Sequence, residues 1–261
     1  MYSEQVSNSK LLKVINEQKV LRLIYTDGPI SRVELAERTG LTQQTITNIV
    51  RRLLQHDILL ETAPTAGSGG RRPIPLEVNS ANLYAIGIRV TFRYVQGTLM
   101  NFKNEALKEI TEHFSATDSE HDSLSYIYKA VEELLKWVPN KQKLIGIGCS
   151  VQGFVNPHKG IVIYSAGLGW RQFPLKELLE QKFSIPVHLD TGTNLLALVQ
   201  NLKGALAESR QNITLKFDDG VGGAFVVNKE LHRGASYVAG GFSHYKAFTG
   251  ENAYPCHCGA K

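Results

Sequence analysis

The sequence predicts a small helical domain over residues 1–78, followed by an α/β domain over residues 79–261. Three observations support this prediction. Apolar residues recur at helical spacing over residues 16–58, and residues 62–73 are rich in Gly, Pro, Ser and Thr, as in a hairpin tip or a linker. Beyond that segment, apolar runs typical of strands alternate with helical ones. A chain of 261 residues, 43% of them hydrophobic, can bury a core in each domain.

The helical domain is expected to contain three short helices. The helical pattern breaks at residues 27–29 (Asp-Gly-Pro) and again at Gly40, because Pro and Gly interrupt helices. Ser31 precedes the second helix. Its hydroxyl can accept a hydrogen bond from the backbone amide of Glu34, while the Glu34 carboxylate can accept one from the backbone amide of Ser31. These two hydrogen bonds make a capping box. The third helix carries an apolar stripe that must face the small core. The stripe consists of Ile46, Ile49, Val50, Leu53 and Leu54.

The second domain shows the alternation expected of an α/β fold. Apolar runs predict strands at residues 83–90, 95–102, 144–151, 212–217 and 223–228. Helical patterns predict helices at residues 123–138 and 173–183. The order of these segments indicates a single α/β domain after the linker.

The outward face of the third helix is polar, and residues 41–56 contain no acid. Gln and Asn side chains can bond adenine edges and Arg can reach guanine or phosphate, whereas a carboxylate would be repelled by phosphates. A short capped helix, a glycine turn and a longer helix form a helix-turn-helix, whose second helix reads DNA. A merely solvated polar face is the alternative interpretation. The candidate DNA-binding residues here are Gln43, Gln44, Thr45, Thr47, Asn48, Arg51 and Arg52.

Residues 67–73 (Gly-Ser-Gly-Gly-Arg-Arg-Pro) are expected to form the wing of a winged helix-turn-helix. The glycines allow a tight hairpin tip, from which Arg71 and Arg72 can project toward phosphate or the minor groove. An ordinary basic surface loop is the alternative. The whole-chain charge of +5 and the pI near 9.0 are compatible with nucleic-acid binding, but this excess is too mild to identify a partner.

Cysteine usage and the lack of targeting signals indicate a soluble cytoplasmic protein. Three cysteines provide no secreted disulfide framework. Cys256 and Cys258 are separated by one residue, which favours a metal site over a bridge, while Cys149 lies in a predicted strand and is more simply a core residue. The N-terminus lacks the pattern of a signal peptide, and no stretch approaches the roughly 18 apolar residues of a membrane span.

The sequence resembles the ROK family of repressors and sugar kinases. The likeness of the N-terminal region rests on SRVELAERTGLTQQTITNIVRRLLQHDILLE and GSGGRRPIPLEVN. It continues through GIGCSVQGFVN, GLGWRQFPLKELLEQKFSIPVHLD, ELHRGASYVAGGFSH and CHCG. Nearly the whole chain is covered, and the likeness includes xylose-repressor-like members of the family. The resemblance implies a winged helix-turn-helix followed by an actin-like and hexokinase-like (ribonuclease H-like) α/β domain, with two lobes around a cleft.

The resemblance also implies that the chemistry of the family's kinases is lost. Arg89 stands where the first phosphate motif of those kinases has an aspartate, and Gly192 occupies the position of their general base. The second phosphate loop, residues 218–223, keeps its glycines but starts with two aspartates, which would repel phosphate. We therefore expect no catalytic residues and no ATP binding.

Effector and zinc contacts are likewise implied only by the resemblance. Asn194 and His244 match effector-binding positions, although residues 241–244 (Gly-Phe-Ser-His) lack the glutamate of the family's motif. A packed or exposed His244 without a ligand is the alternative. The zinc motif of the family implies three ligands in this chain, His244, Cys256 and Cys258, with a further cysteine beyond Lys261. The zinc site is therefore expected to be incomplete and the chain to be truncated at its C-terminus relative to the family.

Three functions follow as hypotheses. The first is a repressor of xylose or other carbohydrate utilisation genes that binds double-stranded operator DNA as a homodimer. Its second domain once responded to a sugar, a response that the loss of cleft residues opposes. The second is an active sugar kinase, which the missing base and phosphate motif oppose. The third is a non-catalytic module that acts through hetero-oligomers with an intact relative.

Overall fold

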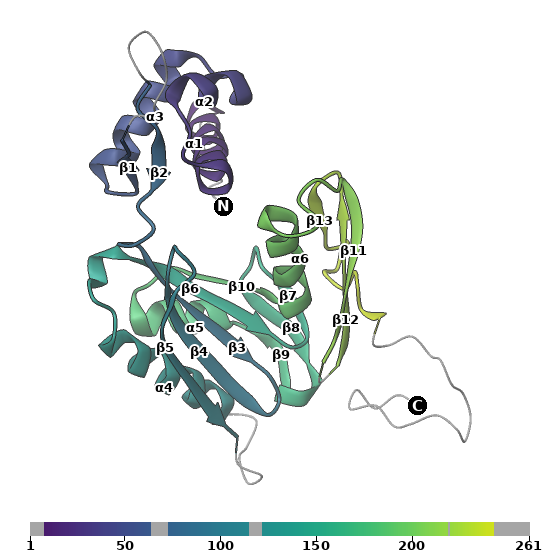
Figure 1. The fold of residues 1–261 in the computed structure, drawn as a ribbon. Helices are drawn as coiled ribbons and strands as arrows, with labels where there is room; N and C mark the ends of the chain where they lie inside the picture. The colour runs from purple at the N-terminus through teal and green to yellow at the C-terminus, as the bar shows by residue number, and fades with distance from the viewer. Residues whose placement is uncertain (1–7, 64–72, 115–121, 219, 243–261) are drawn as a thin grey trace. The chain divides into compact units, whose positions relative to one another are not determined.

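The computed structural model describes residues 8–63, 73–114, 122–218 and 220–242. The chain divides into two units, Met1–Leu83 and Tyr84–Lys261 (Figure 1). The sequence places this boundary after residue 78 instead. Asn79 stays with the first unit because its backbone amide donates to the Ile58 carbonyl at 2.8 Å. No helix in the described part of the chain is long and apolar enough to cross a membrane.

The first unit contains three helices and a two-stranded antiparallel sheet in its described residues. The elements are α1 (Asn8–Asp27), α2 (Arg32–Thr39), α3 (Gln43–Gln55), β1 (Leu59–Glu61) and β2 (Leu76–Val78). The three predicted helices are confirmed, but α1 begins at Asn8 and not at residue 16. Leu11 and Leu12 explain this difference, because adjacent apolar residues point to different sides of a helix and make no one-sided stripe. They are 49% and 55% exposed, respectively.

The predicted start and end of α2 are confirmed. The Ser31 hydroxyl accepts from the Glu34 amide at 3.2 Å, and the Ser31 amide donates to the Glu34 carboxylate at 2.9 Å. Gly40 ends the helix in the left-handed conformation, with φ of +71°, and its amide donates to the carbonyl of Ala36. Both ends of α2 are therefore fixed by local sequence, which sets where α3 can start.

Replacing Ser31 with alanine is expected to destabilise the first unit by about 1 kcal/mol, because the buried hydroxyl satisfies an otherwise orphan amide. The hydrogen bond from the Ser31 backbone lowers the pKa of Glu34. A carboxyl group whose pKa is lowered by folding stabilises the folded state at pH values above the ordinary pKa of glutamate. This stabilisation is lost as the pH falls through the pKa of the folded state. Urea unfolding followed by circular dichroism at pH 7 and pH 3 measures both effects. An unchanged transition midpoint in Ser31→Ala at pH 7 would contradict the expectation.

The stripe of α3 forms the centre of the small core, as predicted. Ile46, Ile49, Val50 and Leu53 are at most 3% exposed, and Leu54 is partly buried against the same cluster. The core also includes Val20 of α1 and Leu76 of β2. Ile30 pairs with Leu76 as an isolated bridge, which fixes the hairpin to the start of α2. The face of α3 opposite this core is consequently left to solvent.

The second unit is built on a five-stranded sheet with the strand order β10-β6-β3-β4-β5. Its strands are β3 (Tyr84–Val90), β4 (Tyr94–Asn101), β5 (Ala106–His113), β6 (Leu144–Val151) and β10 (Val187–Thr191). β10, β6 and β3 are parallel neighbours, whereas β4 and β5 pair antiparallel. α4 (Asp122–Lys136) packs against β3, β4 and β5, and α5 (Leu175–Phe183) packs against β10.

Two three-stranded antiparallel sheets complete the described part of this unit. One contains β7 (Phe154–Asn156), β8 (Ile161–Ser165) and β9 (Trp170–Phe173), and the other contains β11 (Gln211–Phe217), β12 (Val221–Val227) and β13 (Glu230–His232). Short 3-10 helices span Lys141–Lys143 and Ala166–Leu168. α6 (Gly192–Lys203) follows β10 directly and packs on β11 and β12 (Figure 1). α6 therefore links the five-stranded sheet to the sheet β11-β12-β13.

The strands and helices predicted for this domain are confirmed, with shifts at their ends. α5 starts at Leu175 because Pro174 stands at its N-cap. The sequence does not predict β5, which lies at the edge of the sheet and carries charged residues such as Lys108 and Glu112. An edge strand with an exposed face needs no apolar run, and so it leaves little signal in the sequence.

Candidate nucleic-acid interface and ligand cavity

The structure places the candidate DNA-binding residues of α3 on one side of the helix, away from the core. Gln43, Gln44, Arg51 and Arg52 are exposed. Thr45, Thr47 and Asn48 are partly buried. Thr42 forms the N-cap, with its hydroxyl accepting from the Thr45 amide at 3.2 Å. Because this cap and the buried stripe both fix α3, the polar side chains are presented on a rigid helix.

Local hydrogen bonds orient part of this surface. The Gln44 amide donates to the Asn48 side-chain oxygen at 3.3 Å, and the Thr47 hydroxyl donates to the Gln43 carbonyl at 2.8 Å. With respect to the described residues, the Gln43 side chain and the Arg51 guanidinium have no hydrogen-bond partner. These two groups can therefore form new hydrogen bonds to an incoming duplex without breaking old ones.

Arg52 is held differently from Arg51. Its guanidinium makes two hydrogen bonds to the Glu17 carboxylate of α1, at 2.6 and 3.2 Å. The two side chains are 44% and 38% exposed, so the pair is a surface ion pair that stabilises the fold only weakly. A phosphate contact by Arg52 would compete with Glu17, and the DNA-binding role of Arg52 stays a prediction.

The strands of the predicted wing are present, and its tip is not described. β1 and β2 pair antiparallel, with Leu59 opposite Val78 and Glu61 opposite Leu76. Arg32 at the start of α2 forms an ion pair with Glu61 at 2.7 Å, which ties the hairpin to the helices. Arg71 and Arg72 lie outside the described residues. Their minor-groove or phosphate contacts stay predictions.

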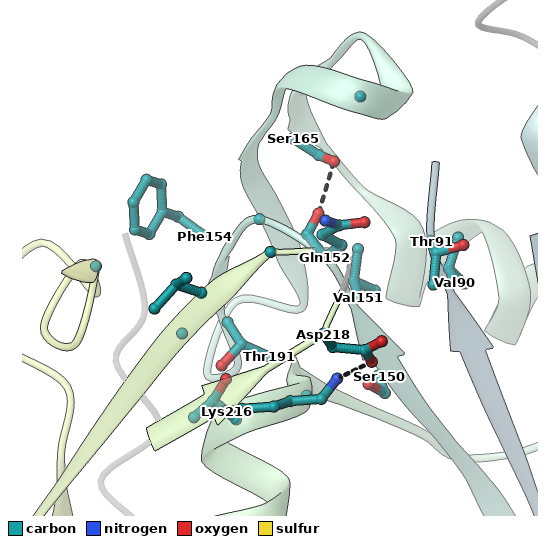
Figure 2. Close-up of a pocket in the computed structure, with 18 of the residues that line it drawn as sticks. Val90, Thr91, Ser150, Val151, Gln152, Phe154, Ser165, Thr191, Lys216 and Asp218 are labelled. Carbon is teal, nitrogen blue, oxygen red and sulfur yellow. Dashed lines mark hydrogen bonds and ion pairs between the residues drawn. The ribbon is translucent and has the colours of Figure 1, made fainter. Parts of the chain in front are cut away.

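The second unit contains a cavity of about 300 Å³ that is lined by residues from each of its three described sheets (Figure 2). Arg89 comes from β3, and Ser150 comes from β6. Thr191 and Gly192 open α6, and the segment from β11 to β12 supplies Lys216, Asp218 and residues 220–223. The ends of parallel strands thus meet a glycine-rich hairpin, an arrangement that commonly binds small ligands.

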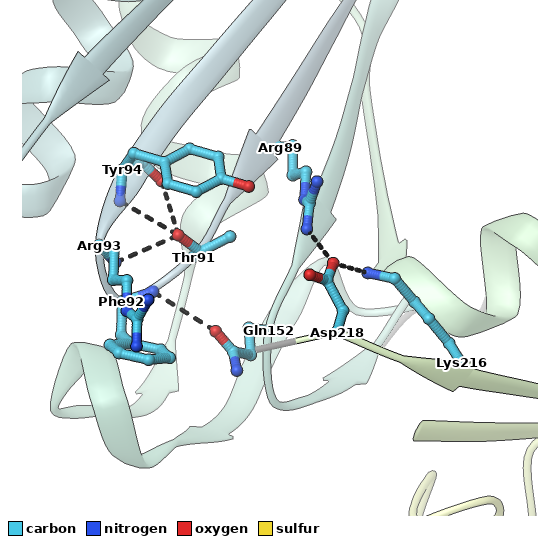
Figure 3. A network of polar contacts seen from close by, with 8 residues as sticks. All are labelled: Arg89, Thr91, Phe92, Arg93, Tyr94, Gln152, Lys216 and Asp218. Carbon is cyan, nitrogen blue, oxygen red and sulfur yellow. Dashed lines mark hydrogen bonds and ion pairs between the residues drawn. The ribbon is translucent and has the colours of Figure 1, made fainter. Parts of the chain in front are cut away.

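The described charged groups of the cavity wall form one cluster. Asp218 pairs with Arg89 and also with Lys216, whose ammonium lies 3.0 Å from the carboxylate (Figure 3). The two cations compensate the charge of Asp218, and the expectation that the aspartates of this loop repel phosphate stays a prediction. Asp219 lies outside the described residues. The sequence analysis does not single out Lys216. Residues two apart in an extended segment share a face, so the spacing of Lys216 and Asp218 is a signal for this ion pair.

Gly192 lies beside polar groups of the cavity wall, and the predicted loss of a general base stays a prediction. A Cβ atom built on Gly192 would lie 3.0 Å from the Ser150 hydroxyl and 3.9 Å from the Lys216 ammonium. Among the described residues that line the cavity, Asp218 is the one acid and no histidine occurs.

Asn194 does not line the cavity. Its side chain is 8% exposed and donates to the Asp190 carboxylate at 2.7 Å. The other oxygen of Asp190 accepts from the guanidinium of Arg233, also at 2.7 Å. The amide of Asn194 is therefore used within the fold. The effector contact predicted for it would require these hydrogen bonds to rearrange.

The predicted zinc ligands His244, Cys256 and Cys258 lie outside the described residues. Within the described ranges, no three His, Cys, Asp or Glu side chains are grouped as metal ligands would be. The zinc site stays a prediction. Cys149 is a core residue, as predicted, and complete burial raises the pKa of its thiol to about 12. Such a thiol stays protonated and is a poor metal ligand or nucleophile.

Comparison with known proteins gives two family matches. Residues 85–261 match the model of the ROK family, and residues 15–59 match the winged helix-turn-helix DNA-binding model. The chain is 29% identical to the putative xylose repressor of a Caldicellulosiruptor species, over 97% of this chain and 63% of that protein. It is 28% identical to the DNA-binding transcriptional dual regulator NagC of Escherichia coli, over 98% of this chain and 62% of NagC. The chain thus spans less than two thirds of the length of these relatives.

Solved structures agree with the fold. A crystal structure of a ROK family transcriptional regulator, a homologue of the E. coli MLC protein, superposes with a TM-score of 0.80 at 24% identity, over 95% of this chain and 63% of that one. A ROK family glucokinase from Streptomyces griseus superposes with a TM-score of 0.58 at 21% identity, over 68% of this chain and 55% of that one. At these identities the two structures support the fold alone. Because the family model matches more than half of the chain, the protein belongs to the ROK family.

Proposed function

We propose that this protein is a sequence-specific DNA-binding repressor of carbohydrate utilisation genes. The observation that carries the proposal is the surface of α3, where exposed Gln43, Gln44 and Arg51 lie on a helix without acids. Such a surface can enter the major groove and bond base edges and phosphates. The names of the relatives, xylose repressor and N-acetylglucosamine repressor, support a gene-regulatory role linked to a sugar. A repressor of this kind acts in the cytoplasm and as a homodimer on a two-fold operator.

The second unit is proposed to bind a ligand without catalysing phosphoryl transfer. A kinase needs a carboxylate to accept the proton of the sugar hydroxyl and carboxylates to hold magnesium at the phosphates. Gly192 provides no side chain, and Asp218, which lines the cavity, is compensated by Arg89 and Lys216. An effector that binds in this cavity would change the affinity of the protein for DNA by shifting the conformation of the chain.

Replacing Arg51 with alanine is expected to weaken DNA binding about tenfold to a hundredfold, because a side chain that contacts a base or phosphate is lost. The measurement is a mobility shift with the intergenic DNA beside the protein's own gene, against random duplex of equal length and at several salt concentrations. Arg210→Ala, an exposed arginine of the second unit, is the matched control and should bind as the unchanged protein does.

Two outcomes together would refute the proposed function. One is equal affinity for intergenic and random duplex, and the other is an unchanged affinity in Arg51→Ala. Loss of binding in both arginine variants would indicate a general effect of positive charge and not a contact by α3.

A further inference from the structure

Arg51 and Arg52 are neighbours near the end of α3, but their guanidinium groups have different surroundings. The guanidinium of Arg51 has no hydrogen-bond partner within the part of the chain that the structure describes. The guanidinium of Arg52 binds the carboxylate of Glu17, which lies on α1 and is 35 positions away in the sequence. One of these two arginines is therefore available to DNA, and the other already has a counter-ion within the protein.

Glu17 occupies the edge of Arg52 that is best suited to a phosphate. The Nε and Nη2 atoms of Arg52 donate to one carboxylate oxygen of Glu17, at 3.2 and 2.6 Å. These two parallel donors are the ones with which a guanidinium binds a phosphate bidentately. Arg52 also lies one turn after Asn48 and two turns after Thr45, so it borders the polar face of α3. A DNA phosphate beside this face would compete with Glu17 for the same donors.

The ion pair between Glu17 and Arg52 is exposed enough to exchange its partners. The two side chains are 38% and 44% exposed, and an ion pair with such access to water stabilises a protein weakly. A phosphate can therefore take the place of the Glu17 carboxylate at small cost to the fold. The exchange still has a cost, however, and a loosely bound duplex supplies less energy to meet it than a closely docked one.

The arginines of α2 are also paired with acids of the first unit. Arg32 forms an ion pair with Glu61 of β1, and Arg38 forms one with Asp27 of α1. Arg51 is thus the one arginine of α2 and α3 without an acid partner among the described residues. The first unit consequently offers few unpaired arginines to the phosphates of any duplex, and attraction that is independent of sequence is weakened.

We propose that Glu17 is a specificity-determining residue, which keeps Arg52 away from DNA that α3 does not recognise. On random duplex, Arg52 stays bound to Glu17. On the operator, base contacts dock α3 closely, and a phosphate replaces the Glu17 carboxylate at the Nε and Nη2 atoms of Arg52. The additional phosphate contact then strengthens the specific complex alone. This inference rests on the proposed function, because it names a residue that sets the specificity of the same surface.

Replacing Glu17 with glutamine is expected to strengthen binding to random duplex about threefold to tenfold, because Arg52 becomes free to contact a phosphate. The dependence of the logarithm of affinity on the logarithm of salt concentration should become steeper by about one, as for one more neutralised phosphate. Affinity for the intergenic duplex should rise less, so the ratio of the two affinities should fall. Fluorescence anisotropy with labelled intergenic and random duplexes at several salt concentrations measures all three quantities.

A double variant shows whether Glu17 acts through Arg52. A carboxylate near DNA also repels phosphates directly, and that repulsion would be lost in Glu17→Gln whether or not residue 52 is an arginine. In the background of Arg52→Met, the gain on random duplex and the steeper salt dependence should both disappear. Glu37→Gln, which removes an exposed acid of α2, is the control for net charge and should leave the salt dependence unchanged. Circular dichroism confirms that each variant is folded.

Three results would each overturn the proposal. The first is an unchanged affinity of Glu17→Gln for random duplex, the second is an equal gain on both duplexes, and the third is the same gain in the background of Arg52→Met. Failure of the proposed function is distinct from these results, because it appears in the unchanged protein as equal affinity for intergenic and random duplex. In a protein that prefers the intergenic duplex, the three results overturn the role of Glu17 alone.

Discussion

Replacing Ile46 with alanine is expected to unfold or strongly destabilise the first unit while the second unit stays folded. Ile46 lies on α3 directly behind the polar face, is fully buried and belongs to the core that joins α1, α3 and β2. Removing a buried isoleucine side chain costs about 2–5 kcal/mol, through lost burial and the cavity left behind. A unit of this size, Met1–Leu83, has little more stability than that to lose. DNA binding should disappear with the fold of α3.

The two tryptophans make this prediction easy to measure. Trp137 and Trp170 both lie in the second unit, so tryptophan fluorescence reports that unit alone, whereas far-ultraviolet circular dichroism reports both units. In urea, Ile46→Ala should shift part of the circular dichroism transition and leave the fluorescence transition in place. Gln55→Ala, an exposed change on the same helix, is the control. A joint shift of both signals would mean that the two units unfold together, contrary to the expectation.

Local signals made most of the first unit predictable. The capping box at Ser31, the left-handed Gly40 and the buried stripe of α3 each depend on residues close in sequence, and each is found where expected. The start of α1 was not predictable in this way, because Leu11 and Leu12 leave no one-sided pattern. In the second unit, apolar runs identified β3, β4, β6, β11 and β12, but not the charged edge strand β5, nor β7 to β10 or β13.

The candidate sites were predictable in part. Helical periodicity alone separates the face of Gln43, Gln44 and Arg51 from the core, so the position of the proposed DNA-binding surface follows from the sequence. The cavity does not, because its charge depends on contacts between distant residues: Arg89 and Asp218 are 129 positions apart. The resemblance therefore implies that Arg89 and Gly192 replace kinase carboxylates, but it does not predict that Arg89 and Lys216 both contact Asp218.

The second large effect is expected at Arg233, whose guanidinium compensates the buried carboxylate of Asp190. Two hydrogen bonds, at 2.7 and 3.3 Å, join the guanidinium to one oxygen, and the Asp190 side chain is 4% exposed. Arg233→Met should destabilise the second unit by about 3 kcal/mol, because it leaves a buried negative charge without its cation. The fluorescence transition in urea should then move to lower denaturant concentration, while the first unit keeps its own transition.

A double variant separates the stabilisation that the ion pair provides from the destabilisation caused by a buried charge without its partner. In Arg233→Met with Asp190→Asn, no uncompensated charge remains, and the side-chain amide introduced at position 190 can still bond to Asn194, so much of the lost stability should return. Lys129→Met, which removes an exposed ion pair with Glu112, is the control and should have little effect. Charge compensation requires the double variant to be more stable than Arg233→Met. If the two variants were equally unstable, Arg233 would stabilise the second unit through the packing of its side chain and not through its charge.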